Sequence, residues 1–122
     1  MSTDRRHILG RRGEELAREH YERLGFRVLE RNYRCRAGEL DLILFGAGTI
    51  VFVEVKTRRA GGLDPIESIT PAKQRRLRRL AASWLAEKPG RPPARELRFD
   101  AVGIVLDARG RLLALDQREA VM

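Results

Sequence analysis

Two apolar segments in the middle of the chain, residues 39–45 and 50–56, constrain the fold more than any other feature. Successive side chains of a strand point to opposite faces of a sheet, and both segments are apolar at nearly every position except their ends. Strands of that kind are covered on both faces. The turn-forming Gly46-Ala47-Gly48 between them predicts an antiparallel hairpin. The chain therefore needs a sheet with a layer packed against each face.

Sequence patterns on either side of this hairpin predict the helices that would form those layers. Apolar residues spaced by three and four predict a helix over residues 10–24, which Gly25 ends. Thr70-Pro71, an N-cap followed by proline at the first helical position, predicts a second helix to about residue 87. The remaining patterns predict a short strand at 26–29, an extended basic stretch at 32–36, and closing strands at 97–106 and 112–115. The resulting order, αβββαββ, is that of an α/β fold in which helices flank a mixed β-sheet.

The length of the chain suits one compact domain, residues 1–122, and is too short for two ordinary ones. No apolar run approaches the ~20 residues that cross a bilayer. The first fifteen residues contain no apolar secretion signal. We therefore expect a cytoplasmic protein without a membrane partner.

The charge balance is strongly basic, because 25 lysine and arginine residues oppose 17 acidic ones and give a net charge of +8. All but three of the basic residues are arginine, whose planar fork of donors suits phosphate. Such a surplus favours a polyanionic partner, most simply nucleic acid. A bias of the genome or of growth temperature toward arginine is the alternative explanation.

Cysteine and histidine are too scarce for a soft-metal site. Cys35 is alone, so the chain cannot form an internal disulfide, and His7 and His20 lack the spacing of metal ligands. If the protein binds a metal ion, oxygen atoms must hold it. Oxygen ligands favour magnesium or manganese.

Charged residues at the ends of the apolar strands are the candidates for chemistry. Strict alternation places Glu39, Asp41 and Ile43 on one face of the first strand, opposite Leu40, Leu42 and Leu44, and places Glu54 and Lys56 on one face of the second. A buried carboxylate costs several kcal/mol unless it is paired or binds a metal. Lys56 could form a structural salt bridge with Glu54 or Asp41, but one lysine cannot neutralise three acids. Carboxylates that hold a divalent ion beside an ammonium group are what phosphodiester cleavage requires.

Two motifs at these positions are specific enough to compare with a known family: Gly38-Glu39-Leu40-Asp41-Leu42-Ile43 and Val51-Phe52-Val53-Glu54-Val55-Lys56-Thr57-Arg58. Together they resemble the signature of the PD-(D/E)xK nuclease superfamily. Within that superfamily the chain resembles the small bacterial YraN-like family, which is itself similar to archaeal Holliday junction resolvases. The likeness also covers four shorter motifs, Gly13-Glu14-Glu15-Leu16-Ala17, Asn32-Tyr33-Arg34, Lys73-Gln74 and Arg98-Phe99-Asp100.

This resemblance implies a restriction-endonuclease-like fold and assigns roles to the motif residues. Asp41, Glu54 and the backbone carbonyl of Val55 would bind Mg²⁺ or Mn²⁺, and Lys56 would be the catalytic lysine. The family also places a glutamate of the first helix near the metal. Glu14 follows the apolar stripe of that helix, whereas Glu15 follows its charged side, so helical phase favours Glu14. Leu40 stands where the superfamily signature often has proline, which leaves Glu39 as either a residue supporting the ligands or a strand-end acid.

Several basic and polar residues are candidate contacts to nucleic acid. Lys73 and Gln74 lie in the first turn of the second helix, where free backbone N–H groups favour phosphate. Arg58 and Arg59 begin a predicted basic loop directly after Lys56. Arg34 and Arg36 precede the acidic strand, and Arg75, Arg76, Arg78 and Arg79 are placed on the outer face of the second helix, as a phosphate track or a solvated surface. Arg98 and Asp100 are more simply explained as an ion pair that supports the sheet.

The leading hypothesis is therefore a metal-dependent nuclease acting on DNA, with branched or single-stranded structures as its candidate substrates. One alternative is a non-catalytic nucleic-acid-binding module with a vestigial nuclease site. Another is a structural or partner-binding domain in which the acids and the lysine form a salt-bridged network. Because a resolvase cuts two strands with two sites related by symmetry, a homodimer is a further expectation from the resemblance.

Overall fold

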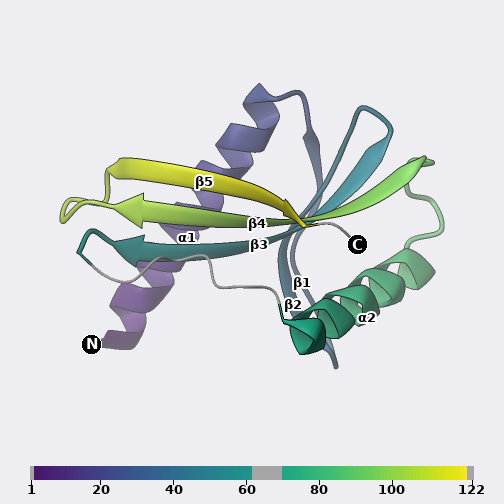
Figure 1. Ribbon diagram of the computed structural model, residues 1–122, viewed down its shortest axis with the longest axis horizontal. Helices are drawn as coiled ribbons and strands as arrows, with labels where there is room; N and C mark the ends of the chain where they lie inside the picture. The colour runs from purple at the N-terminus through teal and green to yellow at the C-terminus, as the bar shows by residue number, and fades with distance from the viewer. Residues whose placement is uncertain (1, 62–69, 121–122) are drawn as a thin grey trace.

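The computed structural model describes residues 2–61 and 70–120, which form a five-stranded sheet between two helices (Figure 1). Along the chain the elements are α1 (Ser2–Arg23), β1 (Arg27–Cys35), β2 (Gly38–Gly46), β3 (Thr49–Arg59), α2 (Pro71–Glu87), β4 (Glu96–Leu106) and β5 (Leu112–Ala120). Neighbours in the sheet follow the chain, β1-β2-β3-β4-β5, and all pairs are antiparallel except β3 and β4. The predicted order αβββαββ is confirmed, and the mixed sheet is consistent with a restriction-endonuclease-like fold.

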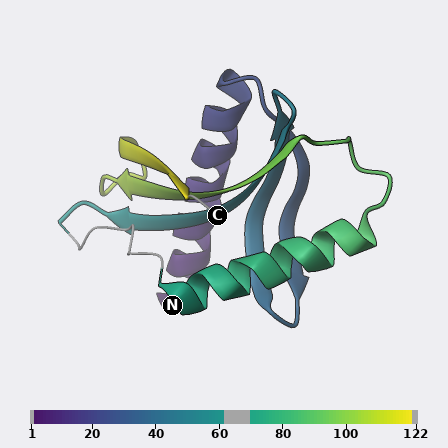
Figure 2. The ribbon, with the colours of Figure 1, turned by 45° about the vertical axis from the view of Figure 1, so that its right-hand side comes forward.

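The two helices cover opposite faces of the sheet, as Figure 2 shows. The α1-side core joins Leu16, Ala17 and Tyr21 of α1 to sheet residues that include Leu42, Leu44, Val51 and Val53. The α2-side core joins Leu77, Leu80 and Trp84 of α2 to sheet residues that include Leu40, Ile43, Ile50 and Phe52. Side chains of β2 and β3 contribute to both cores, so the two strands are buried on both faces, as their composition predicted.

Local signals in the sequence set two of the boundaries. Ala47 and Gly48 both have left-handed backbone conformations, with φ of 51° and 76°, and form a two-residue turn between β2 and β3. Such a turn matches the twist of an antiparallel hairpin. At the start of α2, Thr70 is the N-cap, because its hydroxyl accepts a hydrogen bond of 3.1 Å from the Lys73 amide.

Other boundaries differ from the sequence prediction. Residues 26–29 and 32–36 do not form separate segments, because β1 is one strand with a bulge between Val28 and Glu30. β3 does not end at Lys56, because it pairs in parallel with β4 along its whole length, from Thr49↔Glu96 to Arg59↔Leu106. The predicted basic loop therefore begins after Arg59, and its residues 62–65 lie outside the described residues. β5 is also longer than predicted, and α1 begins at Ser2 rather than near residue 10.

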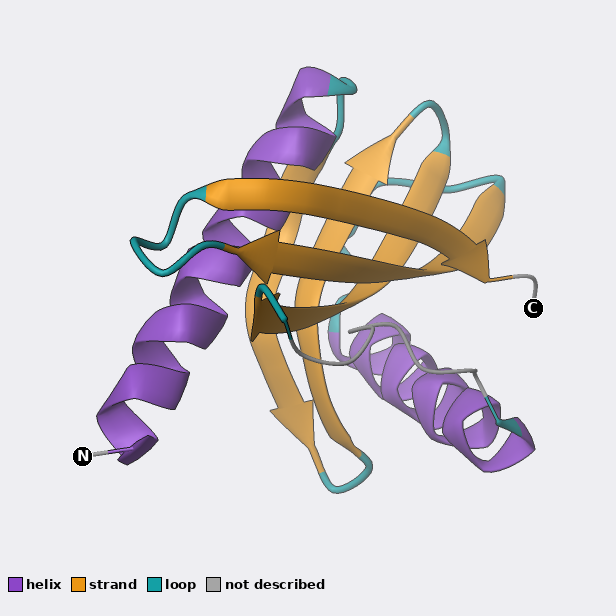
Figure 3. Ribbon diagram, turned by 60° about the vertical axis from the view of Figure 1, so that its left-hand side comes forward, coloured by secondary structure: helices purple, strands orange, loops and turns teal. Residues whose placement is uncertain are grey.

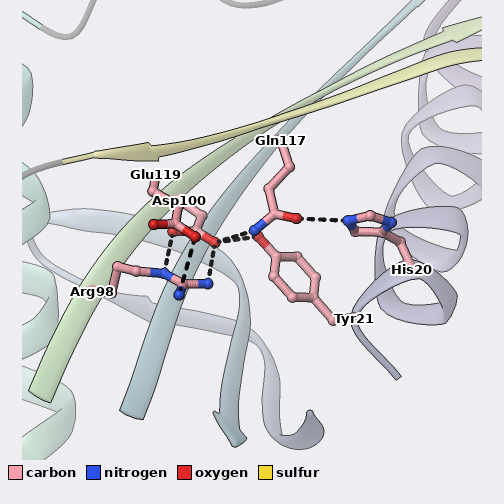
Figure 4. Close-up of polar contacts among 6 residues, drawn as sticks. All are labelled: His20, Tyr21, Arg98, Asp100, Gln117 and Glu119. Carbon is pink, nitrogen blue, oxygen red and sulfur yellow. Dashed lines mark hydrogen bonds and ion pairs between the residues drawn. The ribbon is translucent and has the colours of Figure 1, made fainter. Parts of the chain in front are cut away.

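A buried polar cluster ties α1 to β4 and β5 (Figure 4). The fully buried carboxylate of Asp100 accepts two hydrogen bonds from Arg98, of 2.8 and 2.9 Å, and one of 2.6 Å from the Tyr21 hydroxyl. The amide of Gln117 donates to the same carboxylate, which leaves its oxygen to accept from His20 Nε2 at 2.7 Å. Arg98 and Asp100 thus form the supporting ion pair that the sequence favoured.

Each of the two helices falls short of what a bilayer-spanning segment needs, in length or in apolar character, over the part of the chain that the structure describes.

Candidate functional site

The candidate site lies where β2 and β3 separate. Their ladder ends at Leu42↔Val53, after which β2 continues beside β1 alone and β3 continues beside β4 alone. Figure 3 shows the end of the β1–β2 hairpin pointing away from the end of β3. We call this opening the strand fork, and define it by Asp41 on β2 and by Glu54 and Val55 on β3. Asp41 and Glu54 are the first residues of their strands beyond this ladder, so the two predicted ligands lie on neighbouring strands at the fork.

The regular pleat of the sheet is broken at Asp41. Leu40 belongs to the α2-side core and Leu42 to the α1-side core, so the prediction that both share one face is wrong. The reason lies in β1, where Asn32 has a left-handed φ of 52° and stands across from Asp41, between the pairs Arg31↔Leu42 and Tyr33↔Leu40. This break directs the side chain of Asp41 into the fork, where its Oδ2 accepts a hydrogen bond of 2.7 Å from the Val55 amide.

A close helix contact brings Glu14 to the same place. Gly13 is buried against β3, and a Cβ atom on it would lie only 1.8 Å from Thr57 Oγ1. Because glycine permits this approach, the next residue, Glu14, reaches the fork and its carboxyl group hydrogen-bonds that of Asp41. Glu15 lies instead in an ion pair of 4.0 Å with Arg18. The structure therefore places Glu14 rather than Glu15 beside Asp41, as helical phase predicted.

The acid pair, Glu14 and Asp41, forms no ion pair with a described residue, although arginines lie near it. The pKa of Asp41 is raised to about 7: burial and the nearby carboxyl groups of Glu14 and Glu39 raise it, and the hydrogen bond from the Val55 amide partly opposes them. Burial also raises the pKa of Glu14, while its hydrogen bond to Asp41 and the charge of Arg11 lower it. Two adjacent carboxyl groups whose pKa values are both raised form a site that a cation would stabilise.

The acid pair is open to ligands through a cavity on the α1 face. Its volume is about 260 Å³, and it is lined by Arg11, Glu14, Glu15, Arg18, Arg31, Asn32, Asp41 and Leu42. The lining combines acidic side chains with three arginines from α1 and β1. An ion or a phosphate group therefore has a route to Asp41 that does not disturb the core.

Glu54 lies on the α2 face of the fork and, unlike the acid pair, is surrounded by basic side chains. Its carboxylate lies 3.7 Å from Lys56 Nζ, 3.8 Å from Lys73 Nζ and 3.3 Å from Arg76 Nη2. We call Lys56, Lys73 and Arg76 the basic trio. The expected neighbours Glu54 and Lys56 are thus together, and the structural salt bridge considered from the sequence is present as well. The net charge of the trio and Glu54 is positive.

Arg76 is a site residue that sequence analysis missed. It was placed on the solvated outer face of the second helix, yet its guanidinium contacts Glu54 and its side chain is half-buried. A signal for it existed, because Arg76 follows Lys73 by three residues and so lies on the same side of the helix. The neighbouring arginines hid this signal, because four residues of the same type do not show which of them faces the sheet and which faces solvent.

The predicted ligand set is only partly assembled. Over residues 2–61 and 70–120, no three acidic, histidine or cysteine side chains are placed together to hold a metal ion. Asp41 and Val55 are in contact, and the amide and carbonyl of one residue in a strand point to the same side, so the Val55 carbonyl also lies toward β2. Two carboxyl groups and a carbonyl are hard oxygen donors that fit Mg²⁺ or Mn²⁺. Glu54, the third predicted ligand, is held in ion pairs on the α2 side of the fork.

The remaining candidate contacts to nucleic acid are dispersed. Gln74 is exposed, Arg36 is exposed near the tip of the β1–β2 hairpin, and the exposed Arg34 lies 3.5 Å from Glu39. The charge of Glu39 also acts on both members of the acid pair. Arg58 and Arg59 do not lie in a loop beside the fork, because β3 carries them about 13–17 Å beyond Glu54. Arg59 donates to the carbonyls of Asp107 and Ala108 in the β4–β5 turn.

Comparisons with known proteins agree on one family. Residues 13–104, which include the acid pair, Glu54 and the basic trio, match the family described as "Uncharacterised protein family UPF0102". A UPF0102 protein of Mycolicibacterium smegmatis is 50% identical over 107 residues, covering 85% of each chain. UPF0102 proteins of Streptomyces griseus and Nocardia farcinica are each 46% identical, covering 86% and 93% of this chain and 88% and 87% of their own length.

Proposed function

The chain belongs to the UPF0102 family, and we propose that it is a metal-dependent nuclease that hydrolyses phosphodiester bonds in DNA at the strand fork. One observation carries this proposal, namely that an acid pair with raised pKa values and a basic trio lie on the two sides of one fork. The first suits a divalent ion and the second suits a phosphate. Cleavage of a phosphodiester needs both within reach of each other.

The residues of the fork have distinct roles in this proposal. Asp41, Glu54 and the Val55 carbonyl bind Mg²⁺ or Mn²⁺ with Glu14 alongside, and Asp41 gives up its proton when it does so. The bound ion would polarise the phosphate and lower the pKa of an attacking water. Lys56, whose side chain is 52% exposed, donates to a phosphate oxygen and offsets the negative charge that builds there.

DNA with branched or single-stranded structure is the proposed substrate class. The net charge of +8 favours contacts to the phosphate backbone of nucleic acid. The motifs that resemble those of the PD-(D/E)xK superfamily and of archaeal Holliday junction resolvases favour branched structures. Cutting both strands of such a substrate would require a homodimer with two sites, which is part of the same proposal.

A non-catalytic nucleic-acid-binding module is the second candidate function. The observation that favours it is that Glu54 is held by three cations, while the described residues contain no assembled group of three metal ligands. A protein that had lost catalysis could retain this arrangement as a structural network, with its basic surface still available to nucleic acid.

Cleavage of labelled linear, flapped and four-way DNA with and without Mn²⁺ separates the two. We expect metal-dependent cleavage that Asp41→Asn, Glu54→Gln and Lys56→Ala each abolish. Glu14→Gln should also reduce the rate, whereas Glu15→Gln, the matched change at the next residue, should not. Full activity in all the fork variants would refute the site, and DNA binding without cleavage under any metal would establish the second candidate.

A further inference from the structure

The basic trio on Glu54 points to a role for Arg76 that the proposed nuclease site does not contain. We propose that Arg76 is a phosphate-binding residue. Together with Lys73 it holds the Glu54 carboxylate in ion pairs until a phosphate of a nucleic-acid backbone takes the place of that carboxylate. The proposal rests on the proposed function, since Glu54 is the metal ligand that would be released.

The placement of Arg76 suits a ligand as well as Glu54. Its Nη2 lies 3.3 Å from Glu54 Oε1, while its buried Nε has no hydrogen-bond acceptor among the described residues. The side chain passes over Gly38, where a Cβ atom would lie 3.7 Å from Arg76 Cδ. That distance is an ordinary van der Waals contact, and the unpaired Nε leaves the guanidinium with a donor still to satisfy.

The count of charges shows that Glu54 alone does not account for the trio. Three cationic groups surround one carboxylate, which leaves two positive charges in surplus at a half-buried position. A phosphodiester carries one negative charge and accepts the paired donors of a guanidinium. A nucleic-acid backbone at this point would therefore meet donors already gathered in one place.

In its ion pairs Glu54 is directed away from the acid pair, and three nearby cations weaken its attraction for a metal ion. Both of its oxygens face cations on the α2 side, although it lies on the strand next to that of Asp41 at the fork. Transfer of Arg76 and Lys73 to a phosphate would free the carboxylate to turn into the fork. The metal site would then be completed by the substrate, which explains why the ligands are near one another but not assembled.

A purely structural role for Arg76 is the competing explanation. Helix α2 is already anchored by Leu77, Leu80 and Trp84, each buried in the α2-side core. Partly exposed ion pairs add about 0–1 kcal/mol to stability. The two explanations differ in what the loss of Arg76 does to metal binding, because only displacement predicts that metal binds more tightly without it.

The test compares Arg76→Leu with Arg79→Leu, which removes the same charge from an exposed position on the same helix. Calorimetric titration with Mn²⁺ in the absence of nucleic acid should show about threefold tighter binding for Arg76→Leu, because one competitor for Glu54 is gone. Binding of a labelled four-way DNA junction in EDTA should weaken about tenfold in the same variant. Arg79→Leu should change Mn²⁺ affinity by less than the measurement error, and junction affinity by about twofold at most. Adding Glu54→Gln should abolish the gain in Mn²⁺ affinity.

Unchanged or weaker Mn²⁺ binding by Arg76→Leu overturns the inference, as does unchanged junction binding. If Arg76→Leu does not fold, Arg76→Gln, which removes the charge but keeps a polar side chain, carries the same comparison. The two proposals also fail separately. Cleavage that persists without opposite shifts in the two affinities refutes displacement alone. Opposite shifts in a protein that cuts no substrate refute the nuclease alone.

Discussion

The raised pKa of Asp41 makes the metal binding that we propose at the fork depend on pH in a calculable way. A metal ion binds the ionised carboxylate, so it must displace the proton that Asp41 holds with a pKa of about 7. At pH 8 about a tenth of the sites hold that proton, and at pH 6 about nine tenths do. The apparent Mn²⁺ affinity should therefore fall about tenfold between pH 8 and pH 6, and less than twofold between pH 9 and pH 8.

Calorimetric titration measures both the affinity and the proton. Repeating it in buffers with different ionisation enthalpies gives the number of protons released, which should be close to one per ion at pH 6 and close to zero at pH 8. Asp41→Asn, which cannot ionise, should bind Mn²⁺ weakly and without this pH dependence. An affinity that is constant from pH 8 to pH 6, with no proton released at pH 6, would refute the reasoning. Such a result would mean that Asp41 is already ionised in the free protein or does not contact the ion.

Three other predictions concern the frame of the site and its partner. Gly13→Ala should lower the free energy of unfolding by about 1–3 kcal/mol in thermal denaturation, because its Cβ would overlap Thr57. Gly10→Ala, with no neighbour within 4 Å, should instead raise that free energy by about 0.5–1 kcal/mol, and equal effects would contradict the close helix contact. Tyr21→Phe should cost about 1–2 kcal/mol in urea unfolding, since it removes a buried donor from Asp100, and an unchanged midpoint would show that the bond contributes nothing. Raising salt from about 50 to 200 mM should weaken DNA binding at least tenfold, whereas a flat response would remove phosphate contacts as its basis.

Regular patterns explain how much of the fold was predictable from the sequence. The β2–β3 hairpin follows from continuous apolar strands and a glycine turn, and the start of α2 follows from Thr70 and Pro71. Each of these signals is local, because the residues that determine the structure are adjacent in the chain. The position of Glu14 on the buried side of α1 was likewise set by helical phase within one element.

The parts that were missed depend on contacts between distant segments. Leu40 was assigned to the wrong face because alternation assumes a regular pleat, and the left-handed Asn32 on the neighbouring strand breaks it. The length of β3 depends on its parallel pairing with β4, which begins some forty residues later in the chain. Arg76 was assigned to solvent because nothing within α2 indicates that Glu54 lies across from it.

The strand fork itself explains why reactive groups gather there. A strand that leaves one neighbour exposes N–H and C=O groups on that side, and buried groups of this kind need partners. At the fork the Val55 amide is satisfied by Asp41, a carboxylate rather than the carbonyl of a regular ladder. That substitution introduces a negative charge between two apolar layers, where only a proton, a cation or a basic side chain can offset it. The raised pKa of Asp41 favours a proton at the acid pair, and basic side chains offset the charge of Glu54. A metal cation is the remaining partner, and it is the one that we propose for the acid pair.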